Sequence, residues 1–316
     1  MRFSYNRIIM ILRILSFLLF TQPLCANEPF PYGKLLEFSE VLGHKNRKNI
    51  KFKFNMHDKE IIYQTNEHGH RDKKGLEKEK VLVVGASWTF GLGVSQNQIW
   101  SELLEDTFCD YSFYNISVPG YTIDQIYLSL KEHLKLNKQY SLIIFEISPF
   151  QENALLQSPY SWSPGSRKPF FKKIKSGEYE LIKPSQKVPL VIEGYEQSDS
   201  FFKYFIAGYN KLIKNYILFK KSNSENMEVA SYIFNQTIKL ASENKIPIVF
   251  ISHDNQIDPI KNKLKPPFGL IALDGVQKGN KINEFHRHLN HKGHFKMFEG
   301  ISKYLSENRG FSLCKE

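Results

Sequence analysis

An α/β fold with a parallel sheet covered by helices on both faces is predicted by three features of this 316-residue sequence. Short, continuous runs of apolar and β-branched residues suit strands that are buried on both faces. These runs alternate with stretches whose apolar residues recur at helical spacing. Glycine-rich or Pro-Gly turns follow the first two such strands. Strands that alternate with helices are typical of parallel sheets, and an apolar fraction of 41% is enough for a packed core.

The elements follow in a regular order, beginning with the run VLVV. The prediction comprises a strand at 81–84, a helix from 99 onward, a strand at 111–116, a turn at 118–120, a helix at 122–135, a strand at 142–147, a helix near 230–241, and strands at 246–252 and 270–273. Asn290 is a good N-cap for a final helix that carries Phe298, Ile301 and Leu305.

Two regions stand outside this repeating order. Residues 27–80 are polar and predict an irregular lead-in with short strands at 51–54 and 61–64. Residues 154–224 interrupt the main domain of 81–310 and predict an insertion or lid, with a hairpin at 170–182 and a helix at 201–220.

The first 26 residues are typical of a secretory signal peptide. Arg2 and Arg7 form a positive start, and a short apolar stretch precedes Cys25 and Ala26. That stretch is too short to span a membrane, which takes about 20 apolar residues. We therefore expect export to the periplasm or outside the cell.

Export would leave Cys109 and Cys314 as the remaining cysteines. An oxidising compartment permits a disulfide between them. The sequence leaves open whether they meet in space.

The net charge of +11 arises from 43 basic and 32 acidic residues. The basic residues are scattered, and no basic stripe is interleaved with stacking aromatics, so no nucleic-acid partner is expected. A weak association with anionic polymers or lipids of the cell envelope remains open.

The segment GASWTFGLGV at 85–94 follows the first core strand, where open parallel sheets bind their ligands. A serine at this position, Ser87, would be presented on a glycine-rich turn beside main-chain N–H groups that can stabilise an oxyanion. The alternative is that Ser87 only caps the following helix. The G-x-S-x-G elbow of α/β hydrolases is excluded because Thr89 stands where its second glycine is required. The G-x-G-x-x-G loop of dinucleotide-binding proteins is excluded because Gln96 stands where its third glycine is required.

Four histidines lie in the nine residues HRHLNHKGH at 286–294. A surface patch and a metal site are two alternatives to a catalytic role. The run contains no Cys, Asp or Glu, and a cap at Asn290 would turn His291 and His294 onto a helix. No metal and no cofactor are therefore expected.

Four blocks together resemble the SGNH/GDSL hydrolases. Residues 85–91 (GASWTFG) resemble the family's G-D-S-x-T-x-G block, and residues 115–120 (NISVPG) resemble N-x-x-x-x-G. Residues 288–294 (HLNHKGH) resemble the histidine block, and residues 65–72 (TNEHGHRD) the T-N-x-x-G-x-R stretch. The resemblance covers about residues 60–305 and implies a three-layer α/β/α sandwich with a flavodoxin-like parallel sheet.

The resemblance also implies roles at the site. Ser87 is the nucleophile, His288 is its base, and the backbone N–H groups of Ser87 and Gly120 form the oxyanion hole. Gln151, in a third block that departs from the family pattern, is the candidate side-chain donor. The acid that precedes the histidine is missing, so Glu284 or Asp274 is the candidate to orient it. The first block also has Ala86 in place of the family's aspartate.

The function expected from these residues is that of an exported serine esterase or acyl hydrolase. Its substrate would be an ester of a small molecule, a glycan or a lipid. The departures keep two alternatives open. One is a catalytically impaired protein of the same fold that binds a carbohydrate or lipid, and the other is an acyltransferase acting on an envelope glycan.

Overall fold

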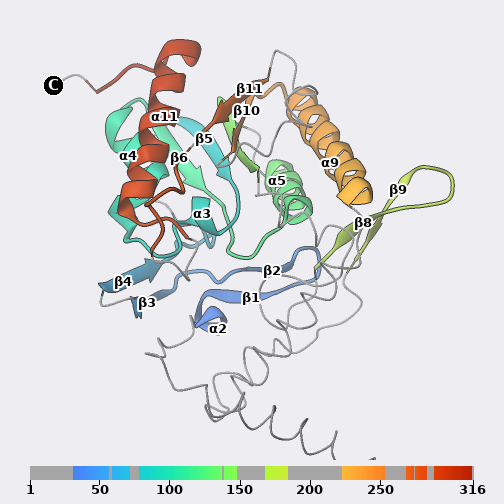
Figure 1. Cartoon of the computed structure of the whole chain (residues 1–316), viewed down its shortest axis with the longest axis horizontal. Helices are drawn as coiled ribbons and strands as arrows, with labels where there is room; N and C mark the ends of the chain where they lie inside the picture. Colours follow the sequence, from blue (N-terminus) through green and yellow to red (C-terminus); the bar gives the residue numbers. More distant parts are fainter. Residues whose placement is uncertain are drawn as a thin grey trace, which may run out of the picture.

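The computed structural model describes residues 31–56, 59–71, 78–136, 139–147, 168–183, 223–252, 268–273, 275–282 and 288–314. At its centre is a five-stranded parallel sheet with the strand order β11-β10-β7-β5-β6 (Figure 1). Its strands are β5 (Glu79–Val84), β6 (Tyr111–Asn115), β7 (Leu142–Ile147), β10 (Ile248–Ser252) and β11 (Gly269–Ala272).

Helices cover both faces of this sheet. On one face lie α4 (Trp100–Thr107) and α11 (His291–Arg309), and on the other α5 (Ile123–Leu136) and α9 (Asn223–Glu243) (Figure 1). Successive residues of β5 point to opposite faces: Val81 packs in the cluster that contains Trp100, and Leu82 in the cluster that contains Ile126. The predicted three-layer α/β/α fold is confirmed, and the uninterrupted apolar run at 81–84 is explained by burial on both sides.

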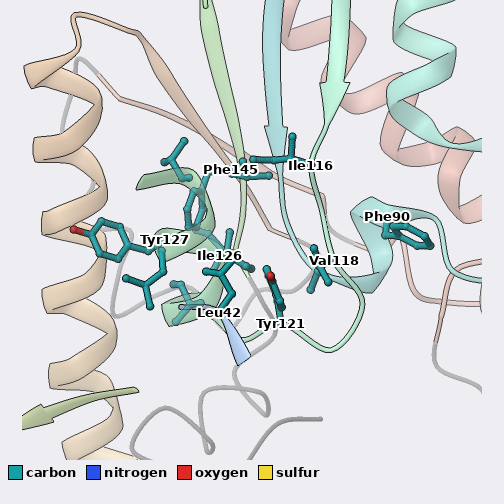
Figure 2. Close-up of a cluster of buried hydrophobic side chains, with 14 of the residues drawn as sticks. Leu42, Phe90, Ile116, Val118, Tyr121, Ile126, Tyr127 and Phe145 are labelled. Carbon is teal, nitrogen blue, oxygen red and sulfur yellow. The ribbon is translucent and has the colours of Figure 1, made fainter. Parts of the chain in front are cut away.

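The hydrophobic cluster on the α5 face extends beyond the carboxyl ends of the sheet strands. Figure 2 shows Phe145 of β7 and Ile126 of α5 in the same buried group as Tyr121 and Leu42. Leu42 lies in the turn of an N-terminal hairpin, so this hairpin shares a core with the main sheet.

The lead-in is more regular than the sequence indicates. It contains α2 (Tyr32–Leu35) and two antiparallel hairpins, β1 (Leu36–Ser39) with β2 (Gly43–Asn46), and β3 (Lys51–Met56) with β4 (Lys59–Gln64). The strands predicted at 51–54 and 61–64 are confirmed within β3 and β4. The β1–β2 hairpin was not among the strands predicted for the lead-in at 27–80. The polar side chains of His44 and Asn46 in β2 are buried and hydrogen-bonded to Pro119, Ser117 and Gly69, so this strand has no apolar pattern.

The described part of the insertion contains the predicted hairpin, formed by β8 (Phe170–Lys173) and β9 (Tyr179–Ile182). Phe171 packs against Tyr127 of α5 and Tyr232 of α9. Just before β8, the ammonium group of Lys168 pairs with the Asp124 carboxylate of α5, and both side chains are fully buried. The described hairpin is therefore attached to the α5–α9 side. The signal peptide predicted at 1–26 and the helix predicted at 201–220 lie outside the described residues.

The remaining predicted elements need only small changes. The strand predicted at 246–252 begins at Ile248, and the strand predicted at 270–273 is shifted by one residue. None of the helices in the described part of the chain has the length and hydropathy that a membrane span requires.

The C-terminal tail is held against the loop between α4 and β6. Cys109 and Cys314 form a disulfide with their Cα atoms 5.0 Å apart. The ring of Phe311 stacks on Tyr111 at 3.7 Å and meets Phe108 edge-on. The pairing that the sequence left open is present in the structure.

Candidate active site

Ser87 is the first residue of a short helix, α3 (Ser87–Phe90), which directly follows β5. Ala86 is the N-cap residue, and no side-chain hydrogen bond caps this helix. The alternative that Ser87 only caps the helix is therefore wrong. The Ser87 residue is 8% exposed, and its hydroxyl has a different partner.

That partner is His288, which is 201 residues later in the chain. The Ser87 Oγ and His288 Nε2 atoms are 2.8 Å apart, a hydrogen-bonding distance. When the imidazole proton is on Nδ1, Nε2 accepts the hydrogen bond from the serine hydroxyl. The two side chains are then arranged as a nucleophile and its general base.

His288 and the residues after it are held by two sets of contacts. Before it, the Ile282 N–H donates to the His288 carbonyl at 2.9 Å, and an isolated bridge pairs Lys281 with Leu289. After it, the Asn290 side chain accepts hydrogen bonds from the first turn of α11 and so provides the predicted N-cap. His288 is thus held between a short β-pairing and a capped helix.

Gly93, shortly after α3, allows the main chain to approach Ile282, whose N–H donates to the His288 carbonyl. The φ of Gly93 is +101°, and a Cβ atom there would lie 2.1 Å from Cδ1 of Ile282. The Gly93 N–H donates to the Tyr63 hydroxyl at 2.9 Å. Only glycine combines this backbone conformation with so close an approach. This explains why glycine stands at position 93 in the segment Gly91-Leu92-Gly93.

The turn that contains Gly120 lies beside the serine turn. The Val118 N–H donates to the Gly85 carbonyl at 3.2 Å, so the two turns are joined at their bases. Gly120 has a φ of +82°, and the Tyr121 N–H donates to the Val118 carbonyl at 3.4 Å. With Pro119 and Gly120 at its centre, this geometry fits a type II turn.

Asn115, the first residue of the same block, has a supporting position. Its amide nitrogen donates to the Thr89 carbonyl at 2.7 Å, and its Oδ1 accepts from the Ser117 N–H at 3.2 Å. Asn115 therefore ties the Gly120 turn to α3.

Glu146 is a site residue that the sequence reasoning missed. It lies near the end of β7 and is 1% exposed, and its Oε2 accepts the Ala86 N–H at 2.7 Å. A Cβ atom at Gly85 would lie 2.2 Å from this oxygen, so glycine is required for the carboxylate to reach the turn. The signal in the sequence was a carboxylate within the otherwise apolar run LIIFEI at 142–147.

Arg71 is a second residue whose position was missed, although the resemblance included its block. The fully buried guanidinium donates to the carbonyls of Phe90, Gly91 and Val94, at the end of α3 and just beyond it. It also packs over the rings of Tyr63 and Phe90 at 4.7 and 4.8 Å. Burial lowers the pKa of Arg71 to about 10, so it remains charged at neutral pH.

Three predicted site residues lie outside the described part of the chain. These are Gln151, the candidate oxyanion donor, and Glu284 and Asp274, the candidates for orienting His288. Their roles stay predictions. Within the described ranges, no group of three or more His, Cys, Asp or Glu residues is arranged to hold a metal ion.

No protein-family model and no curated protein matches this sequence. Solved structures do. A lipolytic protein of the G-D-S-L family from Desulfitobacterium hafniense is 12% identical, with a TM-score of 0.41, and the match covers 72% of this chain and 99% of that one. A G-D-S-L family protein from Veillonella parvula is 11% identical, with a TM-score of 0.42 and the same two coverages. An acetylxylan esterase from Geobacillus stearothermophilus is 11% identical, with a TM-score of 0.36, and the match covers 73% of this chain and 95% of that one. In its layered α/β/α fold, the chain is similar to these G-D-S-L family structures.

Proposed function

We propose that this chain is a serine esterase or acyl hydrolase in which Ser87 is the nucleophile and His288 the general base. The observation that carries the proposal is the 2.8 Å contact between Ser87 Oγ and His288 Nε2. A serine hydroxyl is a weak nucleophile until a neighbouring base accepts its proton. Since His288 is 201 residues away in sequence and its own main chain is hydrogen-bonded to Ile282, the contact follows from the tertiary fold.

The reaction would proceed by acyl transfer through the serine. Ser87 Oγ attacks the carbonyl carbon of the ester while His288 Nε2 takes the hydroxyl proton. The tetrahedral intermediate collapses, its C–O bond to the alcohol breaks, and His288 returns the proton to the leaving alkoxide. A water molecule, activated by the same histidine, then hydrolyses the acyl-serine and frees the acid.

The negative charge on the tetrahedral intermediate needs hydrogen-bond donors. The backbone N–H groups of Ser87 and Gly120 are the proposed donors, with the Gln151 amide as a third. The serine and glycine turns are joined by the bond from Val118 to Gly85, which supports a common site. Removal of one such donor in a serine hydrolase lowers kcat about 10²–10³-fold.

The orientation of His288 is the second requirement of the mechanism. Glu284 or Asp274 is the proposed partner of its Nδ1, and without either the site would act as a Ser-His dyad. Loss of the group that orients the histidine of a triad lowers kcat by about 10⁴. The activity of the chain therefore depends on how this position is filled.

We also propose that the protein acts outside the cytoplasm, on an ester of a small molecule, a glycan or a lipid. The disulfide between Cys109 and Cys314 supports this location, because such bonds persist mainly in oxidising compartments. The net charge of +11 is compatible with weak attraction to an anionic envelope surface.

A catalytically impaired binding protein is the second candidate. The observation that favours it is Ala86, which stands where the family has a carboxylate. This protein would bind the glycan or lipid without cleaving it, and its affinity would be unchanged in Ser87→Ala.

The test is covalent labelling of the folded protein with a fluorophosphonate, which reacts with activated serines. We expect the wild type to be labelled, and Ser87→Ala and His288→Ala to remain unlabelled. Ser306→Ala, which changes an exposed serine of α11, is the matched control and should label like the wild type. A folded wild type that does not react would overturn the proposed activity and favour the binding protein.

A further inference from the structure

The hairpin β1–β2 is hydrogen-bonded to the turn that contains Gly120. His44 Nε2 lies 3.0 Å from the Pro119 carbonyl oxygen, and Asn46 Nδ2 donates to the Ser117 carbonyl at 3.0 Å. In the opposite direction, the Tyr121 hydroxyl donates to the His44 carbonyl at 2.7 Å. The hairpin thus contacts the turn before, within and after its central peptide.

The contact made by His44 is well defined. The residue is fully buried, and its ring meets that of Tyr121 edge-on at 5.1 Å between centroids. A carbonyl oxygen can only accept, so Nε2 carries the proton in this contact and donates it to Pro119. Burial also lowers the pKa of His44 to about 4, which keeps the ring neutral at pH 7.

The carbonyl of Pro119 and the N–H of Gly120 belong to one peptide unit. A trans peptide is planar, and its C=O and N–H point in opposite directions. A donor that fixes the direction of the Pro119 carbonyl therefore fixes the direction of the Gly120 N–H. A hydrogen bond to the carbonyl oxygen also polarises the N–H at the other end of the unit.

The orientation of the Pro119–Gly120 peptide is also what distinguishes the two common types of β-turn. Types I and II differ mainly by a rotation of the peptide between the two central residues, which are Pro119 and Gly120 here. Glycine at the second position tolerates φ of either sign. Pro119 and Gly120 at the two central positions favour the type II orientation, and the hydrogen bond from His44 to the Pro119 carbonyl stabilises that orientation further.

We propose that His44 is a positioning residue that holds the Pro119–Gly120 peptide in the orientation that presents the Gly120 N–H to the oxyanion. The proposal rests on the proposed function, in which Gly120 is an oxyanion donor. It assigns a catalytic purpose to a hairpin that forms its own two-stranded sheet, beside the carboxyl ends of the strands of the main sheet (Figure 1).

The test compares substitutions that remove or keep the donor. His44→Phe keeps a ring against Tyr121 and removes the N–H, His44→Leu removes it with less bulk, and His44→Gln keeps an N–H donor at a similar reach. Glu37→Gln, which breaks a surface ion pair with Lys45 in the same hairpin, is the control. Circular dichroism verifies that each variant is folded.

With an ester substrate, we expect both donor-free variants to lower kcat by about 10–100-fold, short of the 10²–10³-fold seen when a donor is lost outright. KM should change less than about threefold, because the donor acts on the transition state. His44→Gln should recover most of the rate. Fluorophosphonate labelling should likewise be slow in His44→Phe and His44→Leu and close to the wild-type rate in His44→Gln.

The orientation of the turn is measured separately, from the amide resonance of Gly120 in ¹H–¹⁵N spectra. It should shift in His44→Phe and remain in place in Glu37→Gln. A reactive wild type with unchanged rates in the donor-free variants would overturn the role of His44 and leave the proposed function standing. A folded but unreactive wild type would instead overturn the proposed function, and the role of His44 with it.

Discussion

Glu146 provides the sharpest single perturbation of the candidate site. The resemblance implies a carboxylate at residue 86, where this chain has alanine. The Oε2 atom of Glu146, on β7, accepts a hydrogen bond from the main-chain N–H of Ala86 at 2.7 Å. Glu146 is 1% exposed. Truncation to alanine leaves the Ala86 N–H buried without this acceptor, which costs about 1–3 kcal/mol of unfolding free energy.

Glu146→Gln is the finer test, because its amide oxygen can still accept the N–H. Charge-assisted hydrogen bonds are about twice as strong as neutral ones. We therefore expect Glu146→Gln to lose about half as much stability as Glu146→Ala. Ser87 is the next residue after Ala86, and displacement of a reacting group by about 1 Å lowers rates by about 10². Labelling should thus slow strongly in Glu146→Ala and less in Glu146→Gln.

Urea unfolding gives the free energies, and the second-order rate of fluorophosphonate labelling gives the reactivity. Glu132→Gln is the matched control, because Glu132 forms an exposed ion pair with Lys135 on α5. Such pairs contribute less than about 1 kcal/mol, and this one lies on the solvent side of a helix. Should Glu146→Ala label at the wild-type rate and lose no more stability than the control, the positioning role of Glu146 would be refuted.

The remaining predictions concern stability. The Cys109–Cys314 disulfide joins residues 205 apart in sequence, and the chain-entropy relation gives about 5 kcal/mol for a loop of this length. Cys314→Ser, or reductant on the wild type, should lower the unfolding free energy in urea by about 2–5 kcal/mol, and a loss below about 1 kcal/mol would contradict the prediction. His44 is neutral and buried, and burial lowers its pKa from 6.5 to about 4. As the pH falls from 6.5 to 4, His44 is therefore protonated in the unfolded state before it is protonated in the folded state. Stability is therefore lost across that window, by about 2 kcal/mol at pH 5 for this residue alone. His70 and His133, whose pKa values burial also lowers, to about 3 and about 4, add to the acid sensitivity. The loss between pH 7 and pH 5 should be smaller in His44→Gln than in the wild type, and an identical pH dependence would show that His44 is not the group responsible.

The main sheet could be predicted from sequence because its pattern is local. The runs at 81–84 and 142–147 are apolar on both faces, which indicates strands buried between two helical layers. The cap at Asn290 and the hairpin around Gly177 were also predictable, since each depends on residues a few positions apart. The β1–β2 hairpin was missed because β2 is polar, and its His44 and Asn46 side chains are buried by hydrogen bonds that reach residues 75 and 71 positions away.

The sequence by itself determined the layered α/β architecture, and its resemblance to the SGNH/GDSL hydrolases indicated the serine and histidine blocks. The architecture could be predicted because patterns of burial and of turn residues involve residues that are close in sequence, and hydrophobic periodicity reveals them. Only the tertiary structure decided that Ser87 meets His288, that Cys109 meets Cys314, and that Glu146 reaches the turn before the serine. Each of these contacts joins residues 60 to 205 positions apart. Their distances depend on how the sheet and its loops pack, and no local pattern in a single sequence encodes such distances.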